Sequence, residues 1–130
     1  MASDNEELVK QGYDLFGKGD LDGLGKIYND DTAHSFPGNN QIAGEHKGRD
    51  ACFAMYGKLF ELTDGTFKAD LKSTTAKGDD TVVAKHQATG KRNGRTLDLE
   101  ETLTFTVKDG KIARLESSFD DQAAADEFWA

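Results

Sequence analysis

The sequence predicts an α+β fold in which helices cover the apolar face of an antiparallel sheet. Three observations support this prediction. Apolar residues follow helical periodicity in several segments of the first half of the chain. From residue 67 onwards the apolar period changes to two, which is typical of strands. Two turn signals, Asn93-Gly94 and Asp109-Gly110, then divide this alternating stretch into hairpins.

The first helix is expected to begin near the capping-box spacing of residues 3–6 and to stop at Gly17–Gly19. Asp20 can cap a second, shorter helix because its carboxylate can accept hydrogen bonds from free backbone N–H groups. The segment 32–36 reads as a short strand stopped by Pro37-Gly38.

An extended piece around Ile42–Glu45 is expected to pair back with that strand. A third helix of about three turns follows from Arg49. Four antiparallel strands then form a meander, and Asp120 or Asp121 caps a last short helix that ends at Phe128-Trp129. If this sheet curves, its concave face and the helices enclose a cavity.

Composition limits the classes of function. A chain of 130 residues with 36% hydrophobic and 31% charged residues suits one globular domain, spanning residues 1–130. The formal net charge of -8 argues against nucleic acid or an anionic membrane as partner, because both attract clusters of Lys and Arg. No apolar run reaches the length of a membrane span, and the first residues lack the features of a secretion signal. A lone cysteine, Cys52, is expected to be buried and inert, and a cytoplasmic location fits best.

The first hairpin places a polar pair on an apolar sheet face. A two-residue turn at Asn93-Gly94 pairs Arg92 with Arg95, so that His86 lies directly opposite Glu101. A slip of one residue would send the two apolar sets to opposite faces, which a half-buried sheet does not tolerate.

The second hairpin allows two registers. A plain two-residue turn at Asp109-Gly110 would put Arg114 and Glu116 on the apolar face. We therefore predict a three-residue turn, in which Glu101 faces Ser117. The other predicted pairs of this hairpin are Val107–Lys111, Phe105–Ala113, Leu103–Leu115 and Leu99–Phe119. His86, Glu101 and Ser117 would then form one polar row across three strands.

Five segments carry a resemblance to a known family: GDLDGLGKIYNDD (19–31), HSFPG (34–38), AGEHKGRDA (43–51), VKDGKI (107–112) and the FDD near residue 120. With them the chain resembles the ketosteroid isomerase-like and SnoaL-like proteins of the nuclear transport factor 2-like superfamily. The resemblance implies a cone-shaped, strongly curved sheet wrapped around N-terminal helices, and a homodimer formed through the sheet. Members of the superfamily include isomerases, polyketide cyclases, epoxide hydrolases and non-catalytic binding modules.

The catalytic residues of the isomerases carry over poorly. Their base falls on Phe36, one oxyanion donor falls on Gly12 with Tyr13 one place away, and the other falls on Leu103. Only a supporting tyrosine has a match, at Tyr56. The epoxide hydrolases' Asp-Arg-Asp arrangement has no match. The resemblance thus implies the fold and a pocket, and does not imply steroid isomerisation by that mechanism.

The same resemblance places His86 and Glu101 at pocket-lining positions, where the register argument also puts them. Glu101 can orient His86 as a general base, or can itself serve as acid or base if desolvation dominates. His34 shares the strand parity of Phe36 and is a third catalytic candidate. The expected pocket residues are Tyr13, Phe36, Tyr56, Leu99, Leu103, Ser117 and Phe119.

These residues predict a small enzyme that needs no cofactor and acts on an apolar small molecule by acid–base chemistry, as an isomerase, cyclase or hydrolase. The three histidines have no ligand spacing, so no metal site is expected. Two alternatives remain open: a non-catalytic pocket that binds a hydrophobic ligand, with His86 and Glu101 as a structural contact, and a dimeric interaction module that uses the outer sheet face.

Overall fold

The computed structural model describes residues 2–130, and within them four helices and six strands follow one another in the predicted order. The elements are α1 (Ala2–Gly17), α2 (Leu21–Ile27), β1 (Tyr28–Phe36), β2 (Gly44–Lys47), α3 (Arg49–Leu62), β3 (Lys68–Lys77), β4 (Thr81–Arg92), β5 (Arg95–Lys108), β6 (Lys111–Phe119) and α4 (Gln122–Phe128). The predicted caps of the two short helices are present. Asp20 accepts a hydrogen bond from the Gly23 N–H, and Asp121 accepts one from the Ala124 N–H.

All six strands form one sheet in the order β2-β1-β6-β5-β4-β3. Every neighbouring pair is antiparallel except β1 and β6, which run parallel. The prediction of an antiparallel sheet throughout was therefore wrong at this one pairing. Local hairpins fix the relative direction of the other neighbouring strands. Most of the chain separates β1 from β6 in sequence, so no turn sets the relative direction of these two strands.

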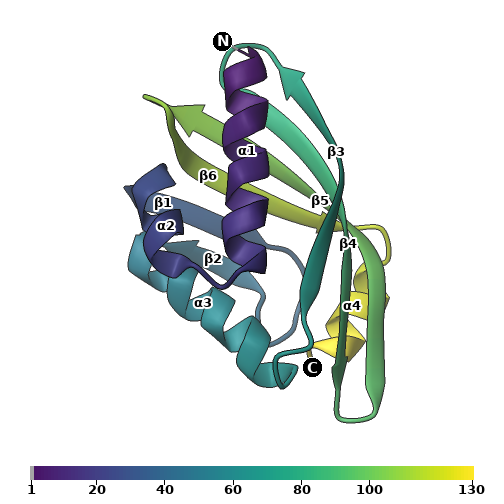
Figure 1. Ribbon diagram of the computed structural model, residues 1–130. Helices are drawn as coiled ribbons and strands as arrows, with labels where there is room; N and C mark the ends of the chain where they lie inside the picture. Colours follow the sequence, from purple (N-terminus) through teal and green to yellow (C-terminus); the bar gives the residue numbers. More distant parts are fainter. Residues whose placement is uncertain (1) are drawn as a thin grey trace.

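The sheet is curved, and α1 lies across its concave face (Figure 1). Helices α2 and α3 lie beside the β1–β2 end of the sheet, and α4 lies near the tip of the β4–β5 hairpin. Arg92 and Arg95 at that tip donate hydrogen bonds to the Phe128 and Glu127 carbonyls, which fixes α4 there. The predicted α+β fold with a curved sheet around N-terminal helices is confirmed.

The predicted register of the first hairpin is confirmed over its whole length. Arg92 pairs with Arg95, and His86 lies opposite Glu101. Asn93 and Gly94 both have positive φ, at 52° and 78°, which is the backbone of a type I′ turn. The concave face of this hairpin is buried, including both members of the polar pair.

The predicted register of the second hairpin is wrong by two residues. Lys108 pairs with Lys111 across a two-residue turn, and an irregularity between Thr106 and Val107 leaves Ala113 as an extra residue in β6. This bulge restores the parity that a plain two-residue turn would lose, so Ile112 and Leu115 are both buried. Beyond the bulge the pairs are Phe105–Leu115, Leu103–Ser117 and Glu101–Phe119.

Consequently the predicted polar row of His86, Glu101 and Ser117 does not form. Ser117 lies opposite Leu103, and Phe119 lies opposite Glu101. The reason is physical. Turn residues and apolar parity can be satisfied either by a longer turn or by a bulge, and the two solutions differ by a shift of two residues that parity cannot detect.

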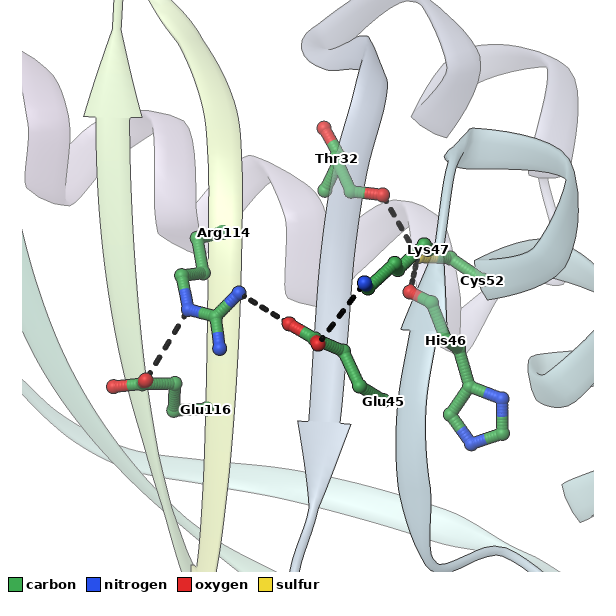
Figure 2. Close-up of polar contacts among 7 residues, drawn as sticks. All are labelled: Thr32, Glu45, His46, Lys47, Cys52, Arg114 and Glu116. Carbon is green, nitrogen blue, oxygen red and sulfur yellow. Dashed lines mark hydrogen bonds and ion pairs between the residues drawn. The ribbon is translucent and has the colours of Figure 1, made fainter.

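The outer face at the β2-β1-β6 end carries a chain of ion pairs, shown in Figure 2. Arg114 contacts Glu45 at 2.7 Å and Glu116 at 3.2 Å, and Lys47 contacts Glu45 at 3.8 Å. Hydrogen bonding to Arg114 holds the pKa of the Glu45 carboxyl below its usual range. Glu116 is exposed as predicted, and Arg114 is half-buried at the solvent-facing surface, so each pair adds little to stability.

Cys52 lies on the inner side of the same region, at the start of α3, and is fully buried as predicted. Its thiol is within 3.4 Å of the Thr32 carbonyl oxygen and 3.5 Å of the His46 carbonyl oxygen (Figure 2). Burial raises the pKa of this thiol to about 11. A thiol that stays protonated at neutral pH is a packing group and not a nucleophile.

Candidate functional site

A cavity lies between the concave face of the sheet and the helices, with an unfilled volume of about 60 Å³. Most of its lining is apolar, but it also contains all three tyrosines of the chain, two of the three histidines, one glutamate and the sole tryptophan. The lining residues are Gly12, Tyr13, Phe16, Tyr28, His34, Phe36, Ile42, Tyr56, Leu59, Phe67, Ala69, His86, Leu97, Glu101, Leu103, Phe105, Ile112, Leu115, Phe119 and Trp129. The tyrosines, the histidines and the glutamate among them fall into two hydrogen-bonded chains.

The first chain joins Tyr13, His86 and Glu101. Tyr13 stands on α1 four residues after the fully buried Val9, on the face that packs against the sheet. Its hydroxyl oxygen is 2.6 Å from Nδ1 of His86, and Nε2 of the same imidazole is 3.0 Å from Oε1 of Glu101. Because His86 and Glu101 keep only 3% and 4% of their surface exposed, this pair is shielded from water.

The hydrogen-bonding capacity of each group gives one proton arrangement when Glu101 is ionised and His86 is neutral. A carboxylate only accepts, so Nε2 of His86 then carries the proton that it shares with Glu101. In this arrangement Nδ1 is an acceptor and receives the hydroxyl proton of Tyr13. Burial, followed by the nearby charge of Glu101, raises the pKa of Tyr13 well above its ordinary value, which keeps this phenol protonated. Both nitrogens of His86 are thus engaged.

The second chain joins Tyr28, Tyr56, His34 and Ser117. The Tyr28 and Tyr56 hydroxyl oxygens are 2.8 Å apart, the Tyr56 oxygen is 2.8 Å from Nδ1 of His34, and Nε2 of His34 is 2.8 Å from the Ser117 hydroxyl. Every group here can donate and accept, so the protons can all point from Tyr28 towards Ser117 or all the opposite way.

Burial also fixes the charge state of this second chain. It lowers the pKa of His34 to about 3, with smaller contributions from His46 and His86, so that His34 is neutral at physiological pH. Burial likewise raises the pKa of Tyr28 and of Tyr56 above the ordinary value. The chain therefore offers neutral hydrogen-bonding groups and no charge.

The structure brings most of the sequence-predicted site residues to this one cavity. His86 and Glu101 are in contact, while His34 lies in the other chain, stacked on Phe36 with ring centroids 4.2 Å apart. Tyr13, Phe36, Tyr56, Leu103 and Phe119 line the cavity. Leu99 and Ser117 lie outside its lining, although Ser117 reaches it indirectly through its bond to His34.

Sequence reasoning missed two polar members of the lining, Tyr28 and Trp129. Tyr28 begins β1, directly after the second helix, and its side chain is buried. Trp129 was expected only as the end of the last helix. A buried aromatic is normally read as packing, and nothing in the spacing of either residue marks its polar atom.

Within residues 2–130, no cluster of three or more His, Cys, Asp or Glu side chains is arranged to hold a metal ion. Over the same residues, no helix combines the length and the apolar composition that crossing a bilayer requires.

Comparison with known proteins agrees with this geometry. The family model for the SnoaL-like domain matches residues 9–115, which is most of the chain. The chain belongs to the SnoaL-like domain family. This places it in the nuclear transport factor 2-like superfamily and confirms the resemblance found in the sequence.

This SnoaL-like protein is similar to two proteins of solved structure and to a further protein compared by sequence. Bal32a, from a soil-derived mobile gene cassette, is 37% identical with a TM-score of 0.97 and covers 99% of this chain and 98% of its own. A protein of Xanthomonas campestris with a cystatin-like fold is 31% identical, has a TM-score of 0.89, and the match covers 95% and 96% of the two chains. An uncharacterized protein of Mycobacterium tuberculosis is 32% identical over 124 residues, 95% of each chain.

Proposed function

We propose that this SnoaL-like protein is a small enzyme, working without a cofactor, that moves a proton on an apolar small molecule by means of Tyr13, His86 and Glu101. The observation that carries the proposal is the buried chain of a phenol, an imidazole and a carboxylate along one side of an otherwise mostly apolar cavity. Retaining a carboxylate at this depth is costly unless it is paired, and its pairing here orients a base.

The arrangement suggests Tyr13 as the group that meets the substrate. Because both nitrogens of His86 are already bonded, the imidazole reaches a substrate only through the phenol oxygen. Tyr13 is thus the catalytic residue of this proposal, and His86 and Glu101 act through it. This refines the sequence-based assignment of His86 as the base.

The proposed step balances as follows. The Tyr13 oxygen takes a proton from an acidic C–H next to a carbonyl, while the hydroxyl proton of Tyr13 passes to Nδ1 of His86. The electron pair of the broken C–H bond stays on the substrate as an enolate, and Glu101 stabilises the imidazolium cation that forms. Return of the proton to another carbon gives isomerisation, and attack of the enolate on a second carbonyl of the same molecule gives cyclisation.

The second chain suggests how the enolate oxygen is stabilised. When its protons all point towards Tyr28, the hydroxyl of Tyr28 is free to donate into the cavity, because Tyr56 donates to Tyr28 and His34 donates to Tyr56. Donors aimed at a developing negative charge in a water-poor site are an effective source of rate enhancement.

The size of the cavity bears on the substrate. Its unfilled 60 Å³ is less than half of the roughly 150 Å³ that takes up a benzene molecule in an engineered protein cavity. A ring-sized substrate therefore enters only when lining side chains move apart. Small cyclic ketones are the appropriate first probes.

The test is exchange of the α-protons of cyclopentanone for deuterium in D₂O, followed by proton NMR. We expect the wild-type protein to accelerate exchange over buffer, and Tyr13→Phe, His86→Gln and Glu101→Gln each to reduce the acceleration by about 100-fold or more. His46→Gln is the matched control, because the His46 imidazole hydrogen-bonds the Ile42 carbonyl and is absent from the cavity lining. It should exchange at the wild-type rate.

Two results would contradict the proposal. If wild type and buffer exchange the ketone equally, there is no carbon-acid chemistry on this class of molecule. If Tyr13→Phe matches wild type while His86→Gln is inactive, the imidazole acts directly and the role given to Tyr13 is wrong.

The second candidate is a non-catalytic pocket for a hydrophobic ligand. It is favoured by the two hydrogen bonds of His86, because an imidazole with both nitrogens bonded within the protein also fits a purely structural contact. On this reading cyclopentanone binds, exchange stays at the buffer rate, and Tyr13→Phe leaves the ketone affinity unchanged.

A further inference from the structure

Trp129 lines the cavity and carries an unpaired polar atom. Its side chain is 1% exposed and forms part of the cavity lining. Across residues 2–130, its indole Nε1 is the buried side-chain nitrogen or oxygen that no hydrogen-bond partner satisfies. The other polar side chains of the lining are all paired, in the two chains described above.

The backbone and ring of Trp129 are held in place. Its backbone N–H donates to the Ala125 carbonyl at 3.0 Å, and its carbonyl accepts from the Gln41 N–H at 3.1 Å. The indole ring meets Phe128 edge-on, with centroids 4.8 Å apart at 90°, and lies 6.0 Å from the ring of Phe67. These contacts hold the indole in the orientation that leaves its Nε1 without an acceptor.

An indole nitrogen is a donor only, and leaving such a donor buried and unpaired costs about 1–3 kcal/mol. A phenylalanine at this position would fill much of the same space without that cost. The polar atom is therefore unexplained by packing, and the cavity is where an acceptor can reach it.

We infer that the indole N–H of Trp129 donates a hydrogen bond to an acceptor oxygen of the bound molecule, and so selects oxygenated ligands over hydrocarbons of equal shape. The ligand class is a small apolar molecule with a carbonyl or similar acceptor oxygen. The inference rests on the proposed function only in that this cavity binds a ligand. Trp129 also differs from Tyr28, whose hydroxyl is free only when the protons of its chain all point towards it.

The test uses two probes of nearly the same shape, cyclopentanone and methylenecyclopentane, in which an oxygen is replaced by a CH₂ group. Because Trp129 is the sole tryptophan of the chain, the ¹⁵N-labelled protein gives one indole N–H resonance. Titration with the ketone should move the indole proton downfield, as hydrogen bonding to oxygen does. Titration with the hydrocarbon should not.

Affinities from ligand-observed NMR give a second readout. Trp129→Phe should weaken binding of cyclopentanone about tenfold, the loss expected for one buried hydrogen bond, and leave binding of methylenecyclopentane within about twofold. Phe67→Leu is the matched control. It alters an apolar side chain that lines the cavity and touches the same indole, so it should weaken both probes alike.

The inference is overturned if the ketone leaves the indole resonance unmoved, whether or not it binds, or if Trp129→Phe weakens both probes equally. The resonance is measured on wild type, so this test does not depend on the variant's folding. It also separates from the proposed function. If the indole resonance shifts but no deuterium exchange occurs, only the proposed proton transfer is wrong. If exchange occurs but the indole resonance does not shift, only the proposed Trp129 hydrogen bond is wrong.

Discussion

At the scale of single residues, the contact between Tyr13 and His86 could not be predicted from the sequence. The opposition of His86 and Glu101 was predictable, because a two-residue turn and apolar parity fix that register. The 2.6 Å contact of Tyr13 with His86 joins residues 73 positions apart, and it depends on how α1 docks on the sheet. Docking is set by packing of the whole helix face, which no local pattern encodes.

His34 shows the same limit in its electrostatics. Its strand parity correctly predicted a side chain on the buried face, and it is 3% exposed. The sequence could not assign its partners, Tyr56 and Ser117, because one comes from α3 and the other from β6. Burial beside these neutral partners makes it a neutral hydrogen-bonding group.

This burial predicts a loss of stability in acid. The unfolded chain protonates His34 below its ordinary pKa of 6.5, whereas the folded protein resists protonation down to about 3. The unfolded state therefore binds more protons in this window. The contribution of His34 to the free energy of unfolding is complete above pH 6.5 and falls by on the order of 4 kcal/mol by pH 3.

Urea unfolding at a series of pH values between 3 and 7 measures this effect. His34→Gln, which keeps a donor and an acceptor, should flatten the decline relative to wild type. His46→Gln should keep the wild-type slope, because no comparable burial surrounds His46. Parallel slopes for the two variants would show that the acid sensitivity lies in other groups.

At the scale of elements, the β5–β6 hairpin was predicted with the correct faces and the wrong register. Alternation of apolar residues reports which face a side chain occupies, and it is unchanged by a slip of two residues. The extra residue Ala113 decides the register, but alanine suits either a bulge or a regular strand position. The misplaced partner of Glu101 follows from this single ambiguity.

The loop after β1 offers a prediction about how α4 is fixed. Asp126 of α4 accepts hydrogen bonds from the Asn39 N–H at 3.1 Å and the Asn40 side chain at 2.8 Å. A Cβ atom at Gly38 would collide with Asp126 and Gln122, whereas a Cβ at Gly44 meets no heavy atom within 4 Å. Both glycines have positive φ, at 96° and 115°.

Gly44→Ala should therefore cost only backbone strain, about 1–2 kcal/mol. Gly38→Ala should cost the same strain plus roughly another 1–2 kcal/mol, because the added methyl group separates α4 from the loop. Thermal unfolding of the two variants provides the comparison. Equal melting temperatures would mean that the contact between α4 and this loop contributes nothing to stability.

At the scale of the whole molecule, the order of the elements was predictable from the residues, the curvature of the sheet was implied by the family resemblance, and the parallel pairing of β1 with β6 was not predicted. Periodicity, caps and turn residues are local signals, and they identified each helix and hairpin. The pairing of β1 with β6 joins the two halves of the sheet. It depends on which sheet edge the β1–β2 hairpin joins, a choice made by tertiary packing.

The outer face supports one prediction about assembly. Its β4–β5 portion carries threonine and mixed charge, including Thr102, Thr104 and Thr106, and the family resemblance implies a dimer through this face. We expect light scattering to give the mass of two chains. Thr104→Arg, which adds a charge at the centre of β5, should shift the mass towards one chain. A single-chain mass for wild type would contradict this expectation.

The parallel pairing of β1 with β6 has a consequence for the order of folding. The β3–β6 meander is built from consecutive hairpins, whose contacts are close in sequence and form quickly. The Thr32 hydroxyl bonds the Ile112 carbonyl, and His34 bonds Ser117, across separations of 80 and 83 residues. Such contacts carry a large loop-closure cost, so they form late. We therefore expect the cavity to be completed only when the N-terminal elements dock on a sheet that already exists. A substitution that loosens this docking is expected to open the site before it unfolds the meander.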